Sequence, residues 1–235
     1  MRRLFVNLLD LIFPKRCVGC GRIGNYFCQN CQCAIRLIFH SETICPVCER
    51  PAVAGFTHPM CRTGYTIDGF TSFFHYDGTI KKAVKALKYR LVSDVAAEFV
   101  SLIPETSFLN SFHHKLLHPI FLPIPLHKMR MHQRGFNQAE ILGGFISHRL
   151  QIPMYTDILL RTRETKPQVE MKNKEDRLKN MHGVFGLNPK TQHVLRNKHV
   201  ILFDDVFTTG ATMRSAASVL KHAGANRVWA VTMAR

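Results

Sequence analysis

The stretch that most constrains the fold is residues 200–212, where an apolar run, two acids and a helix start follow one another. Residues 200–203 are uniformly apolar, which is typical of a parallel strand buried on both faces. Asp204 and Asp205 stand at its carboxyl end, and a turn of Thr and Gly leads into a helical pattern. This order of strand, loop and helix predicts an α/β domain with a mostly parallel sheet. The apolar face of the helix would consist of Met213, Ala216, Ala217 and Leu220.

The turn after this strand is chemically suited to a phosphate group. A helix amino terminus has unpaired backbone N–H groups and partial positive charge, so it binds anions without a basic side chain. Gly210 lets the backbone approach a ligand closely, and the threonine hydroxyls add hydrogen bonds. Asp204 and Asp205 suit sugar hydroxyls or a hydrated Mg²⁺ instead. We therefore predict a sugar-phosphate site at Asp204, Asp205, Val206, Phe207, Thr208, Thr209, Gly210, Ala211 and Thr212.

The alternative is an ordinary strand–loop–helix unit whose threonines only cap the helix. An apolar strand, two acids and TTGxT together resemble the phosphoribosyltransferase superfamily. The resemblance implies that the acids contact the ribose hydroxyls of phosphoribosyl pyrophosphate (PRPP) and that the loop surrounds its 5′-phosphate. It is specific to the superfamily and not to one reaction.

The cysteines predict a metal-binding module at the amino-terminal end. All eight precede residue 62, mostly as Cys-x-x-Cys pairs, which favours metal over scattered disulfides and a reducing compartment. Two such pairs have the spacing of zinc knuckles, so we predict one closed, tetrahedral structural Zn²⁺ site. Its ligands would be Cys17, Cys20, Cys28 and Cys31. Cys33 would be a spare. We place the module at residues 1–65 and the α/β domain at residues 66–235.

A third knuckle, at Cys45 and Cys48, has no matching fourth Cys pair. His58 and Cys61 are available, so a second site could consist of Cys45, Cys48, His58 and Cys61. Two alternatives remain open at this point. One is a vestigial site without metal, and the other is a single zinc that uses Cys45 and Cys48 instead of Cys28 and Cys31.

The net charge of +16 favours a polyanionic partner, either nucleic acid or an anionic membrane surface. A predicted helix that begins after a turn at residues 77–78 carries five positive charges that are almost unopposed: Lys81, Lys82, Lys85, Lys88 and Arg90. Such a face costs the helix like-charge repulsion, which suggests contact with nucleic acid or phosphate. A plain solvated surface is the alternative. A predicted basic loop at residues 126–134 would add Lys128, Arg130 and Arg134.

Further elements follow from local patterns. We predict strands at residues 71–76, 120–125 and 227–232, and a helix that continues through residue 150. Polar residues 161–177 would form either a mobile hood over a ligand or a plain connecting loop. At the amino terminus, residues 1–13 predict an amphipathic helix ended by Pro14. Its apolar face would pack on its own domain, or dock on a membrane or a partner protein. No apolar run is long enough to cross a membrane, so we expect a cytoplasmic chain without a transmembrane segment.

Residues 123–140, PIPLHKMRMHQRGFNQAE, closely resemble the characteristic segment of ComF-type proteins. The likeness covers essentially the whole chain, although Gly64 follows Cys61 where many relatives complete a fourth Cys pair. The resemblance implies a zinc module joined to a phosphoribosyltransferase-like domain with PRPP and Mg²⁺ as ligands. It also implies a role in natural transformation, acting on incoming single-stranded DNA at the cytosolic side of the inner membrane. The implied partner is the DNA-translocating helicase ComFA or its equivalent.

An enzyme that transfers a phosphoribosyl group from PRPP to an unidentified nucleophile is the second hypothesis. Such chemistry needs a nucleophile site and a general base, and no motif identifies either, so we assign no catalytic residue.

Overall fold

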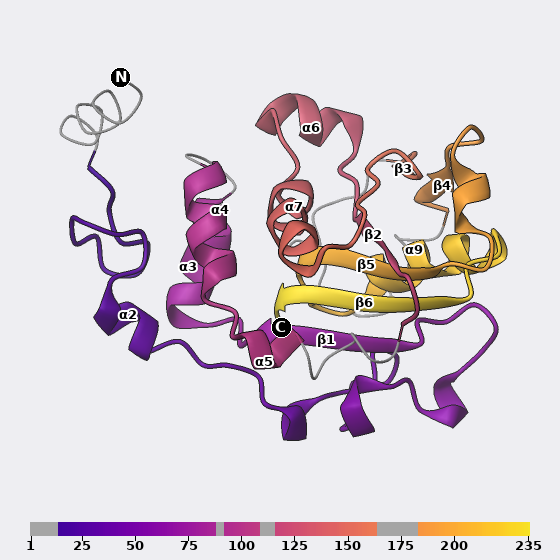
Figure 1. Ribbon diagram of the computed structural model, residues 1–235, viewed down its shortest axis with the longest axis horizontal. Helices are drawn as coiled ribbons and strands as arrows, with labels where there is room; N and C mark the ends of the chain where they lie inside the picture. Colours follow the sequence, from indigo (N-terminus) through magenta and orange to yellow (C-terminus); the bar gives the residue numbers. More distant parts are fainter. Residues whose placement is uncertain (1–13, 88–91, 109–115, 164–182) are drawn as a thin grey trace.

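The computed structural model describes residues 14–87, 92–108, 116–163 and 183–235. Within these residues a parallel four-stranded sheet has the order β1-β6-β5-β2, which confirms the predicted α/β class (Figure 1). In the centre of the sheet, Ile201 pairs with Phe121 on one side and with Trp229 on the other. The strands are β1 (Gly69–Phe74), β2 (Ile120–Pro123), β5 (His199–Val206) and β6 (Arg227–Ala234).

Helices bury both faces of the sheet, which explains why its strands are apolar without alternation. Ile201 and Phe203 belong to the core on one face, under α3 (Gly78–Ala86), α4 (Val92–Ser101) and α7 (Gln138–Leu150). Val200 and Leu202 belong to the core on the other face, under α9 (Ala211–His222). The predicted apolar face of α9 is buried in that second core, as expected.

Shorter elements complete the described chain. The strands β3 (Leu159–Arg161) and β4 (Phe185–Leu187) form a separate antiparallel pair beside α9. The remaining α-helices are α2 (Gln29–Cys33), α5 (Glu105–Phe108) and α6 (Lys128–Arg134). The 3-10 helices are η1 (His40–Glu42), η2 (Val53–Gly55), η3 (Pro59–Cys61) and η6 (Gln192–Leu195). None of the helices described is both long and apolar enough to span a bilayer.

The prediction of a loop at residues 126–134 is wrong, because most of this segment forms α6. The His127 side chain caps the first turn by accepting from the Met129 N–H, and Gly135 ends the helix with φ +75°. β5 is longer than the predicted residues 200–203, because it continues to pair with β6 through both acids. β1 ends at Phe74, two residues before the predicted end. The predicted amino-terminal helix at residues 1–13 lies outside the described residues.

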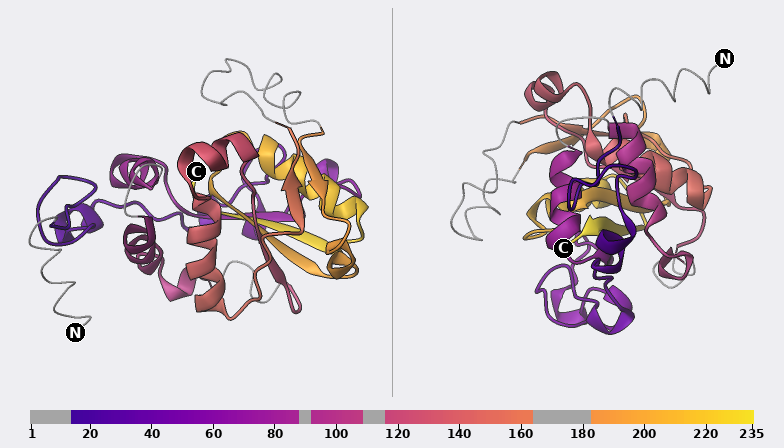
Figure 2. Two further views of the ribbon diagram at one scale, coloured as in Figure 1. Left: turned by 90° about the horizontal axis from the view of Figure 1, so that it is seen from above. Right: turned by 90° about the vertical axis from the view of Figure 1, so that its left-hand side faces the viewer.

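The cysteine-rich segment packs directly on the α/β domain (Figure 2). Residues 36–38 lie along the free edge of β1, where Leu37 forms an isolated bridge with Phe74. The segment from Cys17 to Cys31 is hydrogen-bonded to Lys82 of α3 and to Glu98 of α4. The Lys82 Nζ donates to the Gly19 carbonyl at 2.6 Å, and the Phe27 N–H donates to Glu98 at 2.8 Å.

Candidate functional site

A cavity of about 490 Å³ lies at the carboxyl ends of β2 and β5 and contains most of the predicted sugar-phosphate site. From Asp204 to Thr212, every predicted residue lines this cavity except Thr209. Parallel α/β sheets bind ligands in the crevice at this edge, so its position agrees with the fold. The assignment of the ligand itself stays a prediction.

The phosphate loop, which we define as Thr208–Thr212, has a shape that its neighbours also determine. Gly210 has φ +67°, in the left-handed region that favours glycine. A Cβ at Gly210 would lie 2.6 Å from the Phe207 ring and 3.3 Å from the Pro46 carbonyl oxygen. Packing inside the protein therefore requires this glycine, in addition to any approach by a ligand. The Thr209 hydroxyl is buried and has no hydrogen-bond partner in the described part of the chain.

The two acids at the end of β5 affect each other's ionisation. Burial, followed by the charge of Asp205, raises the pKa of Asp204 well above its ordinary value. The Asp205 N–H donates to Asp204 Oδ1 at 2.9 Å, and the nearby charge of Arg161 opposes the rise in pKa only in part. A carboxyl pair of this kind gains from a bound cation or from sugar hydroxyls, because either would offset the repulsion between the acids.

Three arginines line the same cavity as the acids: Arg130 and Arg134 from α6, and Arg161 from the end of β3. Burial, followed by the charge of Arg130, lowers the pKa of Arg161, while Asp204 opposes that shift. Guanidinium groups bind phosphate oxygens through paired hydrogen bonds, so this wall suits an anionic ligand. We did not assign Arg161 as a site residue from the sequence. Its position at the start of the predicted hood was the available signal. Residues 164–177 of that hood lie outside the described residues.

The start of α7 supplies further polar groups that sequence reasoning missed. Asn137 caps the helix through the Ala139 N–H and donates to the Ile124 carbonyl at 2.9 Å. Gln138 accepts from Arg134 at 3.0 Å, whereas its buried Nε2 has no hydrogen-bond partner among the described residues. Both side chains line the cavity, so Gln138 offers a donor to a ligand there.

The predicted nucleic-acid residues separate into groups. Lys81 and Lys85 are exposed on α3, whereas the Lys82 ammonium is bound to Gly19. Lys88 and Arg90 lie outside the described residues. Lys128 is exposed and does not line the cavity, unlike its neighbours Arg130 and Arg134. The α6 arginines therefore line the cavity, whereas Lys81 and Lys85 of α3 do not.

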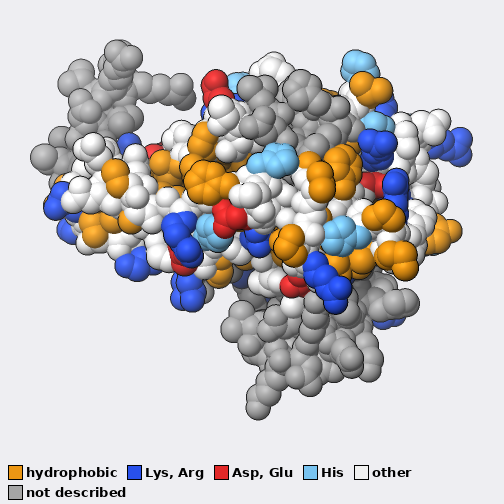
Figure 3. All heavy atoms as spheres, turned by 90° about the horizontal axis from the view of Figure 1, so that it is seen from below, with side chains coloured by type: hydrophobic (Ala, Val, Ile, Leu, Met, Phe, Trp, Pro, Cys, Tyr) orange, Lys and Arg blue, Asp and Glu red, His pale blue; other side chains and the backbone are white. Residues whose placement is uncertain are grey.

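Aromatic side chains near α3 offer little exposed surface for base stacking. Phe73 and Phe74 are buried in the core, and Tyr76 lines the cavity. Burial, followed by the charge of Asp205, raises the pKa of Tyr76. On the face shown in Figure 3, Lys and Arg side chains lie in small groups between hydrophobic ones and do not form one continuous stripe.

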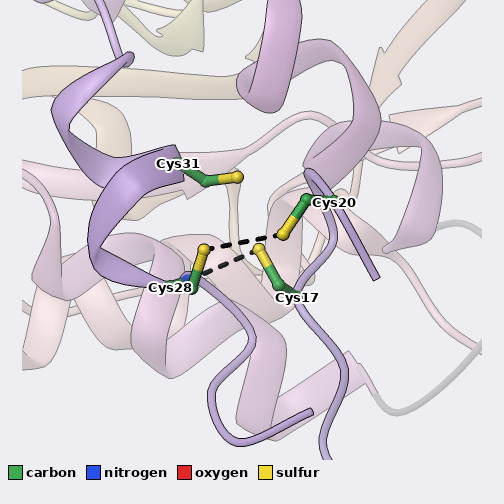
Figure 4. Close-up of side chains that lie close together, drawn as sticks. All are labelled: Cys17, Cys20, Cys28 and Cys31. Atoms are coloured by element: carbon green, nitrogen blue, oxygen red, sulfur yellow. Dashed lines mark hydrogen bonds between the residues drawn. The ribbon is translucent and has the colours of Figure 1, made fainter. Parts of the chain in front are cut away.

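The first four predicted zinc ligands lie together, and their sulfurs point toward one another (Figure 4). All four sulfurs of Cys17, Cys20, Cys28 and Cys31 are within 4.8 Å of one another. The Cys20 and Cys28 sulfurs are 3.6 Å apart. A tetrahedron with Zn–S bonds of about 2.3 Å places its sulfurs about 3.8 Å apart. This cluster, which we name the first zinc cluster, fits a closed structural Zn²⁺ site.

The ionisation of these thiols also points to a cation. Burial opposes ionisation of Cys17, but backbone N–H groups, the first of them at Cys28, lower its pKa to about 6. Burial and then the neighbouring Cys17 raise the pKa of Cys31 to about 12. Ionisation of one thiol therefore disfavours ionisation of its neighbour, and a metal ion held by the four sulfurs would offset this effect.

The structure also brings Cys45, Cys48, His58 and Cys61 together, with their donor atoms within 4.8 Å of one another. We name this set the second zinc cluster. His58 Nδ1 lies 3.3 Å from the Cys48 sulfur, while its Nε2–H donates to the Pro51 carbonyl at 2.9 Å. This outer hydrogen bond leaves Nδ1 free to bind a metal. The alternative of a single zinc that uses Cys45 and Cys48 instead of Cys28 and Cys31 is wrong, because the two donor sets are separate.

We expect Asp204→Asn to raise the melting temperature of the ligand-free protein at neutral pH. Because the folded-state pKa of Asp204 is raised, its contribution to stability is complete below the ordinary carboxyl pKa. That contribution is lost as pH rises through the folded-state pKa. Asparagine avoids this loss and keeps an oxygen for the Asp205 N–H.

Thermal melts at several pH values would check this result. The difference between variant and wild type should vanish near about pH 4 and widen as pH rises. Asp157→Asn, which removes an exposed carboxylate, should give no such widening. A difference that stays constant with pH would contradict the expected ionisation of Asp204.

Comparison with known proteins agrees with both parts of the structure. Residues 137–235 match the phosphoribosyl transferase domain family, and residues 8–63 match the double zinc ribbon domain family. Competence protein F of Haemophilus influenzae is 32% identical over 223 residues, which cover 95% of this chain and 85% of that protein. Competence protein ComFC of Bacillus subtilis is 28% identical over 84% of this chain and 78% of its own length.

DNA utilization protein YhgH of Escherichia coli (strain K12) is 27% identical over 93% of this chain and 96% of its own length. These likenesses extend across the zinc clusters and the cavity together, not across one of them alone. The chain therefore belongs to the ComF family, with an amino-terminal double zinc ribbon followed by a phosphoribosyltransferase domain.

Proposed function

We propose that the protein handles incoming single-stranded DNA on the cytosolic side of the membrane during natural transformation. The observation that carries this proposal is the likeness, over nearly the whole chain, to proteins named for competence and for DNA utilization. The net charge of +16 supplies a physical means of binding, because lysines and arginines that neutralise phosphates release condensed counterions. Lys81, Lys85 and Lys128 are exposed and available for such contacts.

We further propose that PRPP or a related sugar phosphate, together with Mg²⁺, binds in the cavity beside Asp204. Two acids and three arginines lie in one cavity, so sugar hydroxyls or Mg²⁺ and phosphate groups could each find suitable partners. The phosphate loop begins α9, whose amino terminus attracts negative charge. A ligand there would serve as a substrate or as a regulator of DNA binding.

We expect PRPP with Mg²⁺ to raise the melting temperature by about 5–10 °C at a concentration about 100 times its dissociation constant. A ligand that binds only the folded protein stabilises it by mass action. The double variant Asp204→Asn, Asp205→Asn should lose most of this shift, because the proposed contacts with ribose and Mg²⁺ are removed. Differential scanning fluorimetry over a range of PRPP concentrations measures both shifts.

A matched control variant removes two carboxylates that lie outside the cavity. Asp94 and Asp157 are exposed and do not line the cavity, so Asp94→Asn with Asp157→Asn should keep the full shift. If the Asp204 and Asp205 double variant responded to PRPP as wild type does, the acids would have no part in ligand binding.

Phosphoribosyl transfer is the second candidate function. The observation that favours it is the raised pKa of Asp204, because a carboxyl that ionises nearer neutral pH can exchange a proton with a reacting group. In such a reaction the bond between ribose C1 and pyrophosphate breaks and a bond from C1 to the acceptor forms. The acceptor gives up a proton to a base. Release of pyrophosphate that depends on an added acceptor would establish this activity.

Two further parts of the proposal concern the protein partner and the location in the cell. A DNA-translocating helicase, ComFA or its equivalent, is the proposed protein partner. We also propose a cytoplasmic location at the inner face of the membrane, with contact through residues 1–13. Titration of labelled single-stranded DNA, with and without PRPP and Mg²⁺, tests the central proposal and shows whether the two ligands affect each other.

A further inference from the structure

Arg214, in the first turn of α9, joins the phosphate loop to the second zinc cluster. Its Nη1 donates to the carbonyls of Val47 at 3.0 Å and Pro46 at 3.3 Å. Its Nη2 donates to the Thr209 carbonyl at 2.8 Å. The guanidinium is part-buried between the two segments, so one side chain holds both backbones at a fixed separation.

The same two segments also touch without Arg214. The Gly210 α-carbon is close enough to the Pro46 carbonyl that a Cβ would lie only 3.3 Å from that oxygen. Pro46 and Val47 are the two residues between Cys45 and Cys48, so their carbonyls belong to a metal-binding knuckle. A metal ion that fixes the two sulfurs also fixes these carbonyls, because knuckle structure and metal binding form one equilibrium.

The first zinc cluster has a different setting. Its knuckles contact α3 and α4 through Lys82 and Glu98, whereas Arg214 bonds to the knuckle of the second zinc cluster. Loss of metal from the first zinc cluster should therefore leave the loop intact. The two clusters differ in this respect although they have similar ligands.

We infer that metal binding at the second zinc cluster and sugar-phosphate binding at the loop are cooperative, with Arg214 as the positioning residue that couples them. This inference rests on the proposed binding of PRPP. The metal holds the knuckle carbonyls, the carbonyls hold Arg214, and Arg214 holds the loop backbone at Thr209. Coupling of this kind is reciprocal, so PRPP must strengthen metal binding by the factor by which metal strengthens PRPP binding.

The first test uses the unaltered protein loaded with zinc. A chromogenic zinc chelator is added in excess, with and without PRPP and Mg²⁺, and the release of zinc is followed over time. We expect PRPP to slow the release of one of the two ions by about tenfold, the effect of one lost hydrogen bond in a buried network. Release of the other ion should not change.

The second test uses variants of Arg214. Arg214→Met keeps an apolar stem and removes all three donated hydrogen bonds, so it should weaken PRPP binding by about tenfold or more. It should also abolish the protection of zinc by PRPP, an effect that a general loss of stability would not produce. Arg214→Lys should restore part of the protection. Arg196→Met is the matched control, because Arg196 is exposed and lies beside Gly224, beyond the other end of α9.

Each outcome decides between the proposals. If PRPP neither stabilises the wild-type protein nor protects its zinc, both the proposed ligand and this coupling are wrong. If PRPP raises the melting temperature but protects neither ion, only the coupling is wrong. Protection that persists in Arg214→Met would likewise overturn the role of Arg214. Because the first test needs no variant, a failure of Arg214→Met to fold does not remove the possibility of refutation.

Discussion

Replacing Cys17 with serine should lower the zinc content from about two ions to about one per chain and unfold the segment that carries the first zinc cluster. Structural zinc sites contribute an apparent binding free energy of about 10–16 kcal/mol, and small modules have little other core. Cys17 is buried and accepts from the Cys28 N–H, so its loss removes a ligand and a backbone contact together. Metal analysis and hydrogen exchange of residues 14–34 would measure both effects.

Cys33→Ser is the control, because Cys33 is exposed and lies outside both zinc clusters. It should keep both ions and normal exchange protection. Folding of the α/β domain should survive in Cys17→Ser, since the sheet has its own two cores. Full zinc content in Cys17→Ser, or less than about one ion per wild-type chain, would contradict the assignment.

Single-stranded DNA should bind with an affinity that falls about 60–250-fold between 50 and 200 mM salt. The estimate assumes about four to six phosphate contacts at about −0.7 each in the slope of log K against log salt, for a total of about −3 to −4. Little sequence preference is expected, because phosphate contacts carry no sequence information. Fluorescence anisotropy of labelled oligonucleotides at several salt concentrations gives both the affinity and the slope.

Charge reversal on α3 tests where the contacts lie. Lys81→Glu with Lys85→Glu should reduce the magnitude of the slope by about 1.4, and lower the affinity by about 50-fold or more at low salt. The loss should be uniform across sequences. Lys190→Glu with Lys198→Glu makes the same charge change at exposed positions that precede β5 in the chain, and it should have a small effect. Affinity that does not vary with salt, or no binding at micromolar protein, would favour the enzymatic candidate.

The sequence predicted those features whose causes are local. An apolar run followed by acids, glycine and a helical pattern is complete within residues 200–212, and the structure has β5, the phosphate loop and α9 there. Metal knuckles are likewise local, since Cys-x-x-Cys places two thiols at one turn. The first zinc cluster was therefore predictable from spacing alone, and its four sulfurs do lie together.

Other features depend on contacts between distant segments, so the predictions from the sequence were left open or were wrong. α6 was predicted as a loop, because its short run of basic and polar residues has no apolar periodicity. The second zinc cluster needed the fold to bring His58 to Cys48 and to orient its ring through Pro51. The sequence predicted five positive charges on one helix, and of the three that the structure describes, Lys82 donates to the Gly19 carbonyl.

What the sequence alone determined is the chemistry that each segment carries: a loop suited to anions, an acid pair, thiol pairs and excess positive charge. Only the tertiary structure decided which of these share a site. Arg161 lies in the same cavity as Asp204, and Arg214 binds both Thr209 and the knuckle at Val47, across long separations in the chain. The physical reason is that local patterns fix helices, turns and strands, whereas the burial of two apolar sheet faces fixes which loops meet at the carboxyl ends of the strands.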